Sequence, residues 1–307
     1  MEYLDPRADL TFKKVFGEHH DIVISFLNAL LPLTEEEQIV EIEYLSPEML
    51  PVSDTLKYSL VDVCCKDSSG RQFLVEMQMA WFEDFKKRVL FNASKAYIRQ
   101  LGKSENYRLL RPVYSLNLLN ENFEPNLKGS YHHYRIVHVE HSDKVIDGLQ
   151  LVFVELPKFE LQNFKQKKIR ALWLRFLTEM GKLKEEAPAE LLAVPEIKKA
   201  IEIIQKAAFT EAEMRGYDKF WDAVRTEKSK LSYREEIGEE RGMARGLEKG
   251  LAKGLAKGLE KGLEKGLAKG LEEGVKKTAC AMKAKNISAE TIAACTGLSL
   301  DEIANLN

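Results

Sequence analysis

Two β-type runs joined by a short polar turn constrain the fold of this chain more tightly than any other feature. The runs are 58-YSLVDVCCK-66 and 71-RQFLVEMQM-79, and the break between them is Asp67-Ser68-Ser69-Gly70. A three-residue loop that ends on a glycine in the left-handed conformation is typical of a bulged hairpin. This turn predicts that Asp67 pairs with Arg71.

The same register places two carboxylates opposite each other, because it pairs Asp62 with Glu76. Directly opposed like charges destabilise a sheet, and a bound divalent cation would relieve the repulsion. Two carboxylate oxygens, a backbone carbonyl and waters suit magnesium. Strand alternation also places Gln78 on the same face as Glu76. The alternative is that both acids lie on a solvated outer face and pair with Lys66 or Arg71.

Helix-like and strand-like patterns alternate over residues 1–160, which predicts an α/β domain. The expected elements are two helices before Pro32, a strand over 39–45, a helix over 82–101 and strands over 112–119, 134–140 and 149–156. Residues 161–235 have helical patterns only.

A four-residue repeat fills residues 236–277. Ten glycines fall at every fourth position from Gly238 to Gly274, in units of the form G-L-x-K. Period four on a 100° helix drifts about 40° per repeat, so the leucines wind around the helix instead of forming a heptad seam. Two interpretations stay open: an arm that pairs copies of the chain, and a solvated spacer.

The tail, residues 278–307, resembles a helix-turn-helix fragment. Ser288 can cap a first helix, Gly297 ends it, and Ser299 with Glu302 forms the pattern of a capping box for a second. Acidic residues begin that second helix, which favours a packing or partner role over contact with DNA phosphates.

Composition excludes some classes of protein. Lys+Arg 46 against Asp+Glu 48 gives a net charge of −2, which excludes a globally basic nucleic-acid coat but not a local basic groove. Four cysteines without a CxxC pair indicate reduced thiols.

The N-terminus has no basic segment followed by an apolar one, and no apolar run approaches the ~20 residues of a membrane span. We therefore expect a cytoplasmic protein that does not associate with membranes.

An ordered set of motifs resembles the PD-(D/E)XK nuclease superfamily and, more narrowly, its Rpn branch, the recombination-promoting nuclease/putative transposase proteins of bacteria. The matching motifs are D-x(13)-E-x-Q, 9-DLTFKKVFG-17, 26-FLNALL-31, 85-FKKR-88, 94-SKAY-97, 100-QLGKSENY-107 and 155-ELPK-158. The resemblance implies a restriction-endonuclease-like core, a mixed sheet flanked by helices, with a helical C-terminal extension.

The resemblance also implies a magnesium-dependent endodeoxyribonuclease. Asp62 and Glu76 would take the two acidic metal-binding positions, and the backbone carbonyl of Met77 would complete the protein ligands. Manganese would substitute for magnesium, and calcium would support binding without turnover. Gln78 takes the catalytic position usually held by lysine, as in the Rpn branch, and Val61 replaces the eponymous proline.

Basic and acidic residues around this hairpin are further candidates. The helix over 82–101 carries five cations that could contact DNA phosphates: Lys86, Lys87, Arg88, Lys95 and Arg99. Asp9 and Lys13 match the family pattern, and Glu18 and Asp21 are candidates for an additional acid from the first helices.

Two functions from different classes follow. The first is DNA cleavage linked to recombination, transposition-like events or defence against foreign DNA, by a homo-oligomer formed through the repeat or through the nuclease domain. The second is a degenerate nuclease fold that acts as a DNA-binding or protein-interaction module. Nothing in the sequence separates DNA from RNA as the substrate, because that choice depends on contacts to the 2′-hydroxyl.

Overall fold

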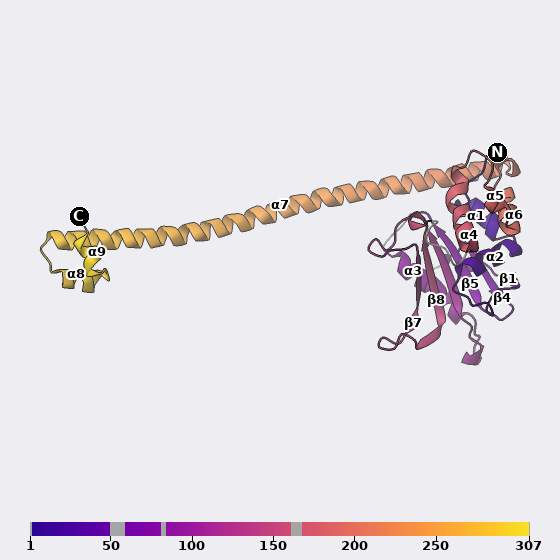
Figure 1. Ribbon diagram of the computed structural model, residues 1–307, viewed down its shortest axis with the longest axis horizontal. Helices are drawn as coiled ribbons and strands as arrows, with labels where there is room; N and C mark the ends of the chain where they lie inside the picture. The colour runs from indigo at the N-terminus through magenta and orange to yellow at the C-terminus, as the bar shows by residue number, and fades with distance from the viewer. Residues whose placement is uncertain (1, 50–58, 81–83, 161–167, 307) are drawn as a thin grey trace. The chain divides into compact units, whose positions relative to one another are not determined.

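The computed structural model describes residues 2–49, 59–80, 84–160 and 168–306, and these fall into two compact units, residues 1–230 and 231–307. The first unit contains a mixed sheet flanked by helices, as expected (Figure 1). The second contains most of one long helix and two short ones.

The main sheet of the described residues has six strands in the order β1-β4-β5-β6-β8-β7. They are β1 (Ile42–Tyr44), β4 (Val63–Asp67), β5 (Gln72–Gln78), β6 (Val113–Leu119), β7 (Tyr131–Val137) and β8 (Val145–Glu155). β5 pairs with β6 in parallel, as does β6 with β8, and the other pairs are antiparallel. A separate two-stranded ladder joins β2 (Glu48–Met49) to β3 (Ser59–Leu60).

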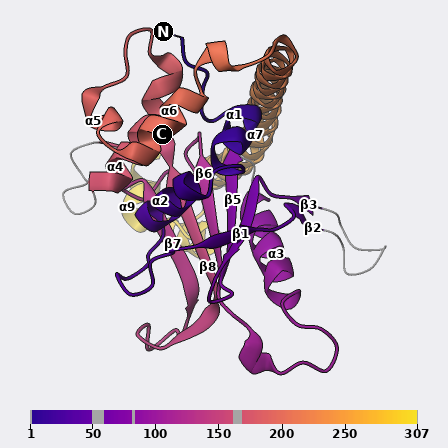
Figure 2. The ribbon, with the colours of Figure 1, turned by 90° about the vertical axis from the view of Figure 1, so that its right-hand side faces the viewer.

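Helices cover both faces of the sheet (Figure 2). The helices of the first unit are α1 (Asp9–Phe16), α2 (His20–Leu30), α3 (Phe85–Ile98), α4 (Lys168–Glu179), α5 (Ala189–Leu192), α6 (Pro195–Ile203) and the start of α7 (Glu211–Ala284). The main core joins α1, α2, α4 and α6 to one face, and smaller clusters join α3 to the other.

An aromatic cluster ties the chain on either side of residue 160 into this main core. Phe16 and Phe26 lie 4.4 Å apart between ring centroids, and Trp173 lies 5.4 Å from Phe26. All three side chains are fully buried. Residues on both sides of residue 160 therefore share one core.

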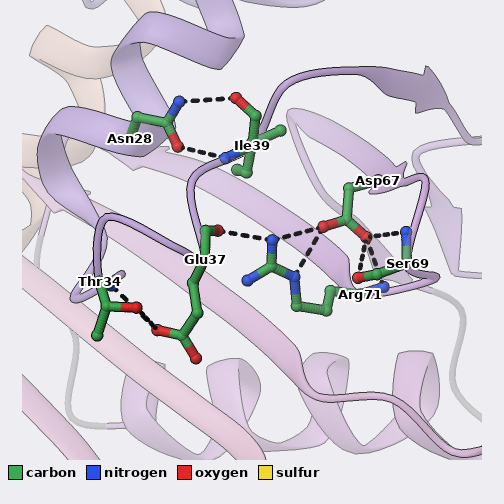
Figure 3. Close-up of polar contacts among 7 residues, drawn as sticks. All are labelled: Asn28, Thr34, Glu37, Ile39, Asp67, Ser69 and Arg71. Atoms are coloured by element: carbon green, nitrogen blue, oxygen red, sulfur yellow. Dashed lines mark hydrogen bonds and ion pairs between the residues drawn. The ribbon is translucent and has the colours of Figure 1, made fainter.

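The predicted hairpin register is confirmed. Lys66 pairs with Gln72 and Val63 with Val75, and Gly70 has a φ of +87°. Asp67 fixes the turn, because its Oδ1 accepts hydrogen bonds from the Ser69 hydroxyl and from the backbone N–H groups of Ser69 and Arg71 (Figure 3).

The same turn is anchored to the loop that follows α2. The Arg71 guanidinium donates to Asp67 Oδ2 at 2.7 Å and to the Glu37 carbonyl at 2.7 Å (Figure 3). Asn28 in α2 then holds both the N–H and the carbonyl of Ile39, each at 2.8 Å. Side-chain bonds to loop backbone thus connect helix, loop and hairpin.

The expected strand over 58–66 is interrupted. β3 ends at Leu60 and β4 begins at Val63, since the Val61 N–H donates to the Pro47 carbonyl and the Asp62 N–H to the Val75 carbonyl. Residue 58 lies outside the described residues. The antiparallel ladder therefore ends one residue before the predicted Asp62–Glu76 pair.

In the second unit, α7 contains the whole glycine repeat, and a Cβ built on any of these ten glycines meets nothing within 4 Å. The seven leucines from Leu247 to Leu271 are 61–71% exposed. No helix of the described residues has the length and apolar character needed to span a bilayer.

The tail forms the two short helices expected from its capping residues, α8 (Ala289–Thr296) and α9 (Leu300–Ala304). Gly297 adopts the left-handed conformation between them, and Ser299 forms the capping box with Glu302. Ile292 and Ile303 pack with Ala279 of α7 into a small core.

Candidate active site

Asp62 lies where the hairpin ladder ends, and its side chain reaches the neighbouring strand. Asp62 Oδ2 accepts a hydrogen bond from the Met77 N–H at 2.6 Å. Burial, with a smaller contribution from the charges of Glu76 and Asp9, raises the pKa of Asp62 to about 6. The Met77 hydrogen bond and the charge of Lys13 oppose this rise. Asp62 is thus a carboxyl group for which ionisation is costly.

Glu76 is a charged residue in the interior, only 4% exposed, on the face of β5 that α3 covers. Its Oε2 accepts from Arg88 Nη2 at 2.8 Å, and its Oε1 accepts from Asn92 Nδ2 at 2.8 Å. Both donors come from α3, one turn apart. They supply the partners that a buried carboxylate requires.

Gln78 is held at both ends of its amide. Its Oε1 accepts from the same Arg88 Nη2 at 2.7 Å, and its Nε2 donates to the Ala80 carbonyl at 2.7 Å. One guanidinium nitrogen therefore bridges Glu76 and Gln78, two of the three side chains predicted to carry the chemistry.

The first helices place only some of their candidates at this site. Asp9 and Lys13 form an ion pair of 2.7 Å on α1, and both act electrostatically on Asp62. Asp21 instead pairs with Lys199 of α6 at 2.8 Å. Burial raises the pKa of Tyr44, and the charges of Asp21 and Glu18 add to this rise.

The cations of α3 separate into two groups. Arg88 and Lys95 form the first group. Arg88 donates to Glu76 and Gln78, and Lys95 is 3% exposed with its Nζ 4.8 Å from the Phe91 ring centroid. Lys86, Lys87 and Arg99 are exposed. Lys86 pairs with Glu124 and Lys87 with Asp84, and Arg99 donates to the Glu48 carbonyl at 3.5 Å.

Sequence reasoning missed Asn92, which is fully buried against Glu76. The signal was available, because Asn92 stands among the apolar residues Val89, Ala93 and Ala96 at helical spacing. A polar residue within the buried face of a helix calls for a polar partner.

The oxygen atoms around Asp62 and Glu76 are of the kind that binds a divalent cation. The two carboxylates are close enough to repel each other, and Asn92 Oδ1 is buried without a hydrogen-bond partner in the described part of the chain. In an extended strand the N–H and carbonyl of one residue point to the same side, so the Met77 carbonyl faces the Asp62 side.

No three His, Cys, Asp or Glu side chains of the described residues form a group that could hold a metal ion. An ion at Asp62 and Glu76 would have two carboxylates, the Met77 carbonyl and waters as ligands, which is a set that magnesium accepts.

The sheet thus carries Asp62 at the end of the hairpin ladder and Glu76 and Gln78 on β5, beside a helix that carries cations. The family model described as PD-(D/E)XK nuclease family transposase matches residues 6–234, more than half of the chain. The chain therefore belongs to this family, and the resemblance found in the sequence is confirmed. No curated protein and no solved structure matches the chain significantly.

Proposed function

We propose that this protein is a magnesium-dependent endonuclease that cleaves DNA phosphodiesters. The observation that carries the proposal is the pair of acids, Asp62 and Glu76, at the end of the hairpin ladder, where burial and the charge of Glu76 both raise the pKa of Asp62. PD-(D/E)XK nucleases usually use divalent metals, and family membership supports DNA as the substrate.

In this proposal Asp62, Glu76 and the Met77 carbonyl hold the ion. A bound divalent cation supplies Lewis-acid polarisation of the scissile phosphate and a water of lowered pKa. The Met77 N–H orients the Asp62 carboxylate, and Asn92 orients that of Glu76. Gln78 positions the attacking water through its amide, since it has no charge to offer in place of the usual lysine.

The exposed cations at the start of α3 supply sequence-independent attraction for the DNA backbone. The side chains of Lys86 and Lys87 are 48% and 80% exposed. Arg99 lies at the other end of the same helix.

Cutting both strands of a duplex requires two active sites, so we propose a homo-oligomer. The leucines of α7 leave a long row of exposed apolar side chains, which favours pairing of copies through the repeat over a purely solvated spacer. A cellular role in recombination, transposition-like events or defence against foreign DNA fits the family description.

Plasmid cleavage by the purified full-length protein in magnesium tests the proposal. Asp62→Asn and Glu76→Gln keep the shape of each side chain and remove its charge, and we expect each to abolish cleavage. Asp143→Asn, an exposed aspartate beside Lys144, should cleave like the wild type, and EDTA should stop all activity.

Other outcomes point elsewhere. Cleavage that survives both substitutions would place the chemistry outside this hairpin. DNA binding without cleavage in magnesium or manganese would favour the non-enzymatic module. The Arg88 contact, which occupies Glu76 and Gln78 together, is the observation that supports this second candidate.

A further inference from the structure

Arg88 neutralises the buried acid of the candidate site from within the protein. Its Nη2 lies 2.8 Å from Glu76 Oε2 and 2.7 Å from Gln78 Oε1. Its guanidinium also lies 4.8 Å from the centroid of the Phe85 ring. A cation is thus already present at the carboxylate that the proposed function assigns to a metal ion.

The two α3 donors to Glu76 differ in charge and in freedom of movement. Asn92 is neutral and fully buried, so its bond to Glu76 Oε1 can persist beside a metal ion. Arg88 is positively charged, and its side chain is 37% exposed. A divalent ion on Glu76 would repel the guanidinium, and the long arginine side chain has solvent into which it can turn.

We propose that Arg88 is a displaceable counter-cation: it balances Glu76 in the metal-free protein, gives up this contact when a divalent ion binds, and then contacts a phosphate of the nucleic acid. This inference rests on the proposed function, because it requires a metal at Asp62 and Glu76. It makes Arg88 a residue that couples ion binding to phosphate binding.

Competition for Glu76 lowers the affinity of the wild-type protein for the ion. Removing the competing charge should therefore tighten metal binding, roughly tenfold for the loss of one charge-assisted hydrogen bond. Arg88→Gln suits this purpose, because glutamine keeps a donor for Glu76 without the positive charge.

The test is Mn²⁺ binding to the full-length protein without DNA, measured by isothermal titration calorimetry. We expect Arg88→Gln to bind Mn²⁺ about tenfold more tightly than the wild type. Lys87→Gln removes the same charge one position earlier on α3, where the lysine pairs with Asp84, and should bind like the wild type. Glu76→Gln should lose binding.

A second measurement follows Arg88 in the wild-type protein and needs no change at Glu76. Side-chain ¹⁵N NMR of arginine reports on the guanidinium, and Arg88→Lys serves only to assign its signal. Adding Mg²⁺ should shift the Arg88 signal with the same midpoint as metal binding.

The outcomes separate the two proposals. Unchanged or weaker Mn²⁺ binding by Arg88→Gln, with binding lost in Glu76→Gln, would overturn the counter-cation and leave the metal centre standing. An Arg88 signal that does not move as Mg²⁺ saturates the site would do the same. Absence of binding in both the wild type and Arg88→Gln, or binding that survives Glu76→Gln, would overturn both proposals.

Discussion

Asp62 reaches across the hairpin to the main chain of Met77, with 2.6 Å between its Oδ2 and the Met77 nitrogen. The bond replaces a ladder interaction, since the backbone of Asp62 turns to the Val75 carbonyl instead. A side chain therefore closes the gap where the strand pairing stops, and one acid is fixed beside the next strand.

Asp62 should make the metal-free protein less stable as the pH rises. Its pKa of about 6 exceeds the ordinary value of 3.8, so the folded state binds more protons than the unfolded state between these values, and stability falls through this window. In EDTA at pH 8, Asp62→Asn should be more stable by up to about 3 kcal/mol.

Urea unfolding between pH 4 and pH 8 measures this effect. The gain of Asp62→Asn should be far smaller near pH 4, because this pH lies close to the ordinary pKa of 3.8 and the unfolded carboxyl is then only partly ionised. Asp143→Asn should show no such trend, and a gain that is equal at both ends of the range would contradict the assignment.

Asn92→Ala should weaken both folding and cleavage. The variant loses the hydrogen bond to Glu76, and bonds to charged groups contribute about 1.5–3 kcal/mol. Removing Oδ1, which has no partner among the described residues, offsets part of this loss, so we expect about 1–2 kcal/mol. Thermal unfolding and plasmid cleavage, with the exposed Asn126→Ala as the control, would check it.

Asp67→Ala should destabilise the hairpin by about 3 kcal/mol, because it leaves the half-buried Arg71 guanidinium without its carboxylate. Four hydrogen bonds to Asp67 disappear at once. Ser68→Ala changes an exposed position of the same turn and should be close to neutral. Equal denaturation midpoints for the two variants would show that the turn does not depend on Asp67.

Deleting residues 236–307 should reduce the assembly state while leaving the nuclease unit folded. The deletion removes the exposed leucines of α7 and the tail helices, and it keeps the described partners of Asp62 and Glu76, which are Met77, Arg88 and Asn92. Light scattering gives the number of protomers for each form. A truncated protein with the same number of protomers as the full chain would place the interface in the nuclease unit.

Local chemistry explains what the sequence predicted well. The turn at Gly70 and the caps at Ser288 and Ser299 depend on a few adjacent residues. Turn chemistry of this kind carries its own register and boundaries, so the β4–β5 pairing and the two tail helices could be placed before the structure was known.

Long-range packing explains what the sequence could not reveal. The main core joins Phe16 to Trp173, and no local pattern indicates that partners so far apart belong together. Asp62 leaves the ladder because of the Pro47 contact made by Val61. Arg88 matched a family motif, but its direction toward Glu76 depends on how α3 lies on the sheet.

The glycine repeat has a consequence for how the chain can change length. Every unit of α7 between Gly246 and Gly270 presents the same spacing of glycine and leucine, and a side chain added at any of these glycines would meet open space. Loss or gain of one whole unit changes the helix by about 6 Å and gives each remaining residue neighbours of the same kind. The repeat is therefore a segment whose length can drift by multiples of four residues without any compensating substitution elsewhere in the protein.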